Sequence, residues 1–239
     1  MDEVPFTGGR VTAGVVRVGD TVRRPAGPNS RFVRALLSHL ERVGFEAAPR
    51  QLGRDEQGRE VFSFQPGQVP DELDAALSDA TLAAAARLIR RFHDATAGSE
   101  IAAPSEVVCH NDLSPANVVF REGRPVGIID FDAAAPGARL DDLGMSLCLW
   151  LNLGTDGPAV PEQGRRVALF CDAYGIGPDA RVVEAIVRAV GRNIEQLRAA
   201  GRAADVEWWQ AQLDWLAERR DELVGVLSGE EAPSGVEPL

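Results

Sequence analysis

The hydrophobic and polar positions along the chain predict a β-rich first part. Residues 10–24 are rich in β-branched side chains around Gly19-Asp20, which predicts two short strands joined by a hairpin turn. Apolar residues from Phe32 to Val43 recur at helical spacing, so we expect a helix that Gly44 ends. Two further strands are predicted over 49–53 and 60–64.

The pattern changes after Pro66-Gly67 and Pro70, and from there it is mainly helical. The expected helices cover 79–96, 140–153, 162–173, 179–200 and 205–227. A short β segment over 107–129 interrupts them. We therefore expect the α+β class, with a small N-terminal lobe over 1–67 and a larger helical lobe over 68–239.

A second hairpin is expected where Val118–Phe120 and Val126–Ile129 flank a turn sequence. If Phe120 pairs with Gly127, then Asn117 and Asp130 lie opposite each other at its open end. An amide oxygen and a carboxylate placed in this way can share one hard cation.

The basic residues are unusual, because all 25 of them are arginine and the chain has no lysine. This excludes a P-loop, which needs a lysine, and lysine-linked pyridoxal chemistry. It also excludes the usual strand lysine of protein kinases. The net charge of −11 makes nucleic acid an unexpected partner.

The charge is uneven, because residues 69–239 hold 15 Arg against 28 acidic residues. This part attracts a cationic small molecule, or it is simply a solvated acidic surface. No apolar run reaches about 18 residues, so no membrane span is expected. The first residues lack the apolar core of a signal peptide, and the three cysteines form no CxxC pair. These features favour a cytoplasmic protein with reduced thiols.

The polar residues of 109–132 carry the chemistry. His110, Asp112 and Asn117 fall in a loop between two predicted strands, and Asp130-Phe131-Asp132 follows the hairpin. A phosphoryl-transfer enzyme needs a carboxylate to orient the attacking hydroxyl and oxygen ligands for Mg²⁺ on the nucleotide phosphates. Asp112 suits the first role, and Asn117 with Asp130 suits the second.

The pattern HxDxxxxN, followed by an apolar strand and IIDFD, resembles the aminoglycoside phosphotransferase and choline-kinase-like family. This family has a two-lobed protein-kinase-like fold, and the resemblance is strong over about residues 107–144. It implies ATP and Mg²⁺ as cofactors, Asp112 as the catalytic base, and Asn117 and Asp130 as the metal ligands. The resemblance also implies three supporting residues. His110 would brace the loop of Asp112, Asp142 would support the same loop from the following helix, and Asp132 would lie beside the metal site.

The resemblance also assigns the first lobe to the nucleotide. The loop Gly8–Gly14 would cover the phosphates through Gly9, Thr12 and Gly14, and the backbone at Phe64 and Gln65 would hold adenine. Arg23, or its neighbour Arg24, would take the place of the missing lysine, since arginine grips two phosphate oxygens at once. The resemblance also implies a glutamate in the middle of the first helix that pairs with the strand cation. The chain departs from the family here, because the only acid of that helix, Glu41, lies near its end.

These features lead us to expect an ATP- and Mg²⁺-dependent phosphotransferase that acts on a hydroxyl group of a small molecule. An aminoglycoside or other antibiotic and an ordinary alcohol metabolite both stay open as acceptors. One alternative is a pseudokinase-like nucleotide-binding or regulatory module without transfer activity. A metal-dependent phosphoesterase that uses the same histidine and aspartates is another, and single residues of the set also suit plain loop caps.

Overall fold

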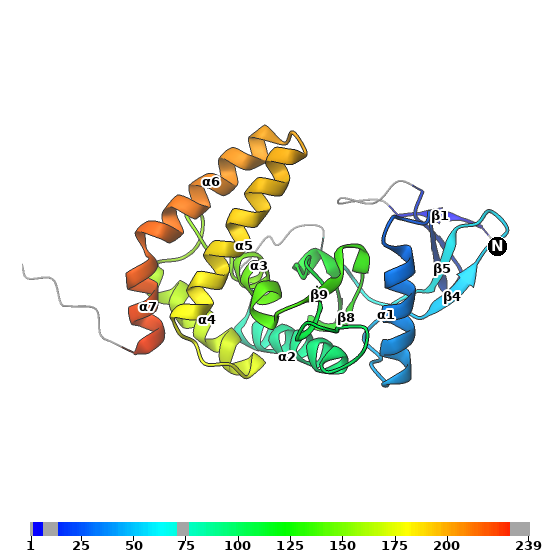
Figure 1. Cartoon of the computed structure of the whole chain (residues 1–239), viewed down its shortest axis with the longest axis horizontal. Helices are drawn as coiled ribbons and strands as arrows, with labels where there is room; N and C mark the ends of the chain where they lie inside the picture. The colour runs from blue at the N-terminus through cyan, green and yellow to red at the C-terminus, as the bar shows by residue number, and fades with distance from the viewer. Residues whose placement is uncertain (1, 7–13, 71–76, 230–239) are drawn as a thin grey trace, which may run out of the picture. The chain divides into compact units, whose positions relative to one another are not determined.

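A computed structural model describes residues 2–6, 14–70 and 77–229 of the chain (Figure 1). The chain forms two units. Unit 1 consists of Met1–Ala75 and Leu88–Arg139, and unit 2 consists of Ala76–Arg87 and Leu140–Leu239. The expected α+β class is therefore present, with a small sheet region and a larger helical part. The lobe boundary between residues 67 and 68 stays a prediction.

The β-branched segments near the start of unit 1 form a five-stranded antiparallel sheet in the order β1-β2-β3-β5-β4. Its strands are β1 (Val4–Pro5), β2 (Val16–Val18), β3 (Thr21–Arg24), β4 (Gln51–Arg54) and β5 (Glu60–Ser63). The expected hairpin at Gly19-Asp20 joins β2 to β3, with Val18 opposite Thr21. The two-residue β1 was not expected, because it carries no alternating pattern of its own.

Helix α1 (Ser30–Arg42) lies beside this sheet (Figure 1) and follows the helical spacing of the sequence. Its apolar face is buried through Val33, Leu36, Leu37 and Leu40. Burying each such side chain contributes about 1.5–3 kcal/mol. Gly44 follows the helix with a φ of +78°, a conformation that glycine adopts without steric cost.

Two small antiparallel sheets complete unit 1. Strand β6 (Val107–Cys109) pairs with β9 (Ala135–Gly137), and β7 (Val118–Arg121) pairs with β8 (Arg124–Ile128). The register predicted for the second hairpin is wrong. Val119, not Phe120, lies opposite Gly127, and Phe120 lies opposite Pro125. Asn117 therefore lies beside Ile129 and not opposite Asp130. The register also shifts between Val119 and Phe120. A bulge of this kind adds one residue to one strand, and the alternation of side chains does not reveal it.

Unit 2 is helical, and α2 (Asp79–Thr96) begins in it and ends in unit 1. The other helices are α3 (Arg139–Leu151), α4 (Val160–Tyr174), α5 (Ala180–Ala199), α6 (Ala203–Glu218) and α7 (Arg220–Ser228). The single helix expected over 205–227 is therefore wrong, since the chain breaks at Arg219 between α6 and α7. Figure 1 shows α5 and α6 as an antiparallel pair. No helix in the described part of the chain is long and apolar enough to cross a membrane.

Candidate active site

Asp112 and Asn117 are joined directly in unit 1. Asn117 ends a short 3₁₀ turn that begins at Pro115, and its Nδ2 donates to Asp112 Oδ2 over 2.7 Å and to the Asp112 carbonyl over 2.8 Å. Because the amide nitrogen faces Asp112, the side-chain oxygen of Asn117 faces away from it. The Asn117 carbonyl accepts from the N–H of Ile129 over 2.9 Å, which places Asn117 beside the residue that precedes Asp130.

Two residues of this site hold left-handed backbone conformations. Asp130 has φ 62° and ψ 63°, and Asn111 has a φ of 63°. Non-glycine residues at such angles are uncommon, and asparagine and aspartate tolerate them better than most. Asparagine is therefore a suitable residue for this backbone conformation at position 111. The Asn111 side chain also donates to the carbonyl of Ala133 over 2.8 Å.

His110 is fully buried and braces the segment from behind. Its Nε2 lies 3.0 Å from the carbonyl oxygen of Ile129, and its ring centroid lies 4.8 Å from that of Phe131. Phe92 of α2 meets the same ring edge-on at 6.4 Å. This environment holds the loop of Asp112 next to the strand end of Asp130, and the role of His110 as a brace of the loop stays a prediction.

Arg24 supplies the cation of the site. It forms ion pairs with Asp130, over 3.1 Å, and with Asp132. Burial works against the charge of Arg24, and the carboxylates of Asp132 and Asp130 outweigh this effect, so that the pKa of Arg24 is raised. Arg23 points to the other face of the strand, where it lies 3.5 Å from Asp55. Of the two arginines, the structure therefore brings Arg24, and not our first choice Arg23, to the candidate metal ligand.

The predicted adenine-binding residues lie at the end of β5. The N–H of Phe64 donates to the Asp20 carbonyl over 2.9 Å, and Arg17 stacks 3.7 Å above the Phe64 ring. Gln65 donates from its side chain to the Ala48 carbonyl over 2.9 Å. The Phe64 N–H is therefore already engaged, and the contact of Phe64 and Gln65 with adenine stays a prediction.

The remaining predicted residues are Gly9, Thr12, Gly14 and Asp142. Gly9 and Thr12 fall outside the described residues, whereas Gly14 stands in a turn with a φ of +85°. Asp142 is buried in the first turn of α3, in unit 2, and its role as a support for the loop stays a prediction.

Asn29 precedes α1, and its side chain makes no capping hydrogen bond to that helix. Instead, Asn29 Nδ2 donates to the carbonyls of Asp132 and Ala134 over 2.9 and 3.0 Å. Nothing in the local pattern identifies such a long-range partner.

The phosphoesterase alternative requires a cluster of metal-binding side chains. Among the described residues, no group of three or more His, Cys, Asp and Glu could hold a metal ion in this way.

Comparisons with known proteins identify the family of the chain. The model of the "Phosphotransferase enzyme family" matches residues 99–181. The trifolitoxin immunity protein of Rhizobium leguminosarum bv. trifolii is 30% identical to this chain. The alignment is 264 residues long and covers 95% of this chain and 99% of that protein. The chain belongs to this phosphotransferase family. The expectation of a phosphotransferase is thereby confirmed.

Solved structures of phosphotransferases share the fold. The chain is 13% identical to spectinomycin phosphotransferase APH(9)-Ia in complex with ADP and spectinomycin, with a TM-score of 0.59, and 95% and 92% of the two chains are covered. It is 15% identical to the GDP complex of aminoglycoside 2'-phosphotransferase-IIIa, also with a TM-score of 0.59 and with 93% of each chain covered. The expected kinase-like fold of this phosphotransferase is therefore confirmed.

Proposed function

We propose that this phosphotransferase moves the γ-phosphate of a nucleoside triphosphate, with Mg²⁺, to a hydroxyl group of a small antibiotic or toxin. One observation supports this most directly. Four side chains are connected within unit 1. The base candidate Asp112 accepts a hydrogen bond from the amide of Asn117, and the Asn117 carbonyl accepts one from Ile129, which precedes the acid Asp130. Asp130 in turn forms an ion pair with the cation Arg24. A loop cap explains any one of these residues but not the linked set.

The residues present fit a magnesium ion. Asn117 offers its side-chain oxygen and Asp130 offers a carboxylate, and Mg²⁺ binds in proteins through a few such oxygen ligands together with phosphates and waters. When bound, the ion neutralises charge on the phosphates. Asp112 accepts a hydrogen bond from the acceptor hydroxyl and aligns it, while Asn117 holds the Asp112 carboxylate in place. These are the roles that we assign to the three side chains.

Arg24 is the phosphate-binding cation in this proposal, in place of Arg23. Its guanidinium carries five N–H donors, and the ion pairs with Asp130 and Asp132 use only part of them. Its Nε has no hydrogen-bond partner among the described residues. One structural relative holds ADP and another holds GDP, so the proposal covers both ATP and GTP as donors.

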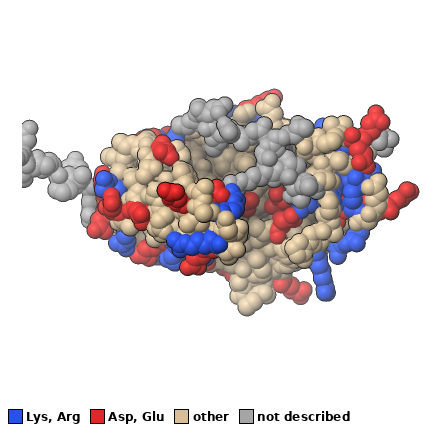
Figure 2. All heavy atoms as spheres, turned by 90° about the horizontal axis from the view of Figure 1, so that it is seen from above, with Lys and Arg blue, Asp and Glu red and all other residues tan. Residues whose placement is uncertain are grey.

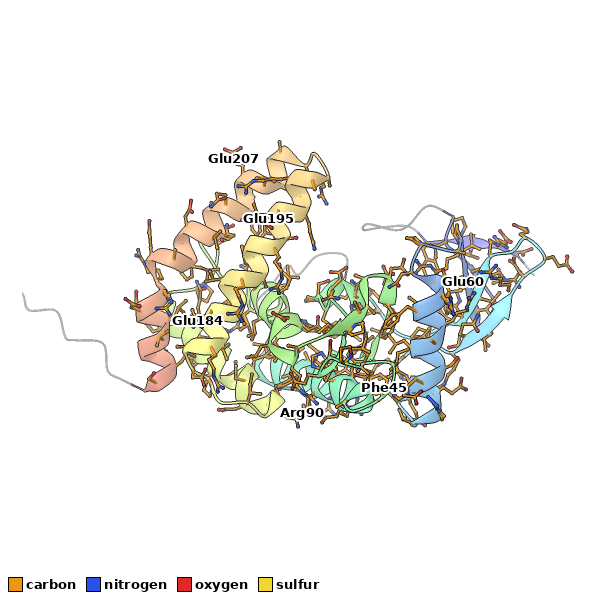
Figure 3. The ribbon with its side chains drawn as sticks, viewed as in Figure 1. Phe45, Glu60, Arg90, Glu184, Glu195 and Glu207 are labelled. Atoms are coloured by element: carbon orange, nitrogen blue, oxygen red, sulfur yellow. The ribbon has the colours of Figure 1, made fainter. Side chains whose placement is uncertain are left out.

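The acceptor class follows from the trifolitoxin immunity protein, 99% of which this chain matches. That protein is named for immunity to trifolitoxin, so the acceptor that we propose is a toxin or antibiotic with a hydroxyl group. A cationic acceptor suits the surface of unit 2. There Glu195 of α5 and Glu207 of α6 have no arginine partner among the described residues (Figure 3). Acidic and arginine side chains are otherwise interspersed on the face shown in Figure 2.

Nucleotide binding is the first test. Thermal unfolding is measured with ATP or GTP, each with Mg²⁺ and with EDTA, and a ligand at 100 times its dissociation constant adds about 2.7 kcal/mol. We expect a shift with at least one nucleotide that is larger with Mg²⁺. Arg24→Gln removes most of this shift. No shift with either nucleotide refutes the proposal.

Transfer to an acceptor is the second test. Sensitive bacteria that express the protein are exposed to trifolitoxin, spectinomycin, aminoglycosides and macrolides, and the purified enzyme is assayed with the same compounds and labelled nucleotide. We expect protection from at least one compound, together with its phosphorylation, and loss of both in Asp112→Ala. Binding of nucleotide without transfer to any acceptor favours the pseudokinase alternative.

A further inference from the structure

Arg24 does not obtain its carboxylate partner from α1. The only acid of that helix, Glu41, lies in its last turn, is 56% exposed and stands 3.8 Å from Arg50. A strand cation in this fold would therefore lack the helix glutamate that the family resemblance leads one to expect.

The helix does form an ion pair with the sheet, but with the charges exchanged. Arg34 of α1 lies 3.6 Å from Glu60 of β5, and Ser30 Oγ donates to the same carboxylate over 2.6 Å. Glu60 is labelled in Figure 3. Glu60 is only 2% exposed and stands opposite Arg24 in the strand register. The helix thus supplies a cation and a hydroxyl to the sheet, and the partner of Arg24 has to come from elsewhere.

Asp132 is held where it can serve as that partner. It lies in the short 3₁₀ turn Phe131–Ala133, which Phe131 anchors by its burial against His110. Asn29, the residue before α1, donates to the backbone carbonyl of Asp132 over 2.9 Å. The carboxylate of Asp132 then pairs with Arg24, whose side chain is only 15% exposed. The backbone of Asp132 is therefore tied to the start of α1, and its side chain to β3.

We propose that Asp132 is the positioning residue for Arg24 and replaces the absent helix glutamate. The inference rests on the proposed function, in which Asp130 serves the metal ion. Asp132 is then the carboxylate that stays with Arg24 while its other donors bind phosphate oxygens. It acts through Arg24 and not as a ligand of the metal.

A double-mutant cycle tests this inference by calorimetric titration with ADP. Asp132→Asn weakens ADP binding about tenfold, which corresponds to about 1.4 kcal/mol. The same change made in an Arg24→Gln background has less than about a twofold effect, because the group that Asp132 positions is gone. Asp55→Asn is the matched control, since it removes the carboxylate beside the neighbouring arginine Arg23 and leaves ADP binding unchanged. Equal effects of Asp132→Asn in both backgrounds overturn the inference.

Binding of Mn²⁺ alone, followed by electron paramagnetic resonance, separates positioning from metal ligation. In the Arg24→Gln background, Asp132→Asn leaves Mn²⁺ affinity unchanged if Asp132 only positions Arg24. A loss of about tenfold identifies Asp132 as a metal ligand and overturns the inference. Relaxation of the Arg24 guanidinium by NMR gives a readout without any ligand, and Asp132→Asn makes this group more mobile. If the wild-type protein binds no ADP, the proposed function fails; an Arg24 signal that Asp132→Asn does not change refutes the inference by itself.

Discussion

Gly67 has no room for a side chain. It stands in the segment after β5, and a Cβ there would lie 2.4 Å from Cγ1 of Val119 and 2.5 Å from the carbonyl oxygen of Phe120. The next residue, Gln68, exchanges two backbone hydrogen bonds with Phe120, of 2.9 and 2.7 Å. These hydrogen bonds join the segment at Gly67 and Gln68 to the β7–β8 hairpin, which starts beside Asn117. We predict that Gly67→Ala moves this segment away from the hairpin and destabilises the protein.

The size of the effect follows from two contributions. The φ of +147° at Gly67 costs a residue with a side chain about 1–3 kcal/mol. Overlap with a backbone oxygen that cannot rotate away adds about 1–3 kcal/mol. Gly53 in β4 allows the backbone cost to be measured without the steric overlap, since its φ is +115° and a Cβ there meets nothing within 4 Å. Gly53→Ala therefore carries the backbone cost without the overlap.

The measurement is a pair of thermal and denaturant unfolding curves for the two variants. Gly67→Ala lowers the free energy of unfolding by about 2 kcal/mol more than Gly53→Ala, which is about 4–8 °C in Tm for a chain of this size. Similar losses in both variants would show that the close approach to Val119 and Phe120 does not constrain the protein, and would refute the reasoning.

Further predictions concern thiols and helix packing. Burial raises the pKa of Cys148 and of Cys171 to about 12, and nearby acids contribute for Cys171. About one of these thiols in 10⁴ is therefore ionised at pH 8. Neither thiol reacts with an aromatic disulfide reagent until the protein is denatured. Because these raised values favour the protonated folded state, the free energy of unfolding falls as pH rises from about 9 towards 12, by up to about 1.4 kcal/mol per unit for each thiol, and urea titrations at several pH values measure this. Gly144→Ala in α3 brings a Cβ to 2.4 Å from the Ala185 carbonyl oxygen and destabilises the protein by about 2 kcal/mol. Gly191→Ala in α5 meets nothing within 4 Å and stabilises it by about 0.5–1 kcal/mol, and the denaturant midpoints of the two variants move in opposite directions.

The sequence predicted the larger elements because each one carries its own periodicity. Helix α2 begins and ends at the residues expected from its apolar spacing, and the hairpin turn at Gly19-Asp20 lies between the expected strands. Strand β9 was missed because its three residues are defined only by pairing with β6. The break at Arg219 was missed because neither glycine nor proline marks it.

The candidate site was predicted less completely, since its contacts join distant segments. Alternation along β3 shows that Arg23 and Arg24 face opposite sides, but the position of Asp130 decides which side is the functional one. The register of the β7–β8 hairpin places Asn117 beside Ile129 and not opposite Asp130, and only the paired strands reveal it. The contact of Asn29 with Asp132 spans 103 residues and has no local signal.

The amide of Asn117 has a consequence for any kinetic study of this enzyme. One side chain holds the carboxylate of Asp112 through its nitrogen, and in the proposed function it offers its oxygen to a metal ion. Removing Asn117 therefore damages the orientation of the base as well as the affinity for the ion, and the effects of replacing Asp112 and Asn117 do not add. The double variant is expected to be little worse than the poorer single one, so the rate losses of the two variants measure one shared unit and not two separate contributions.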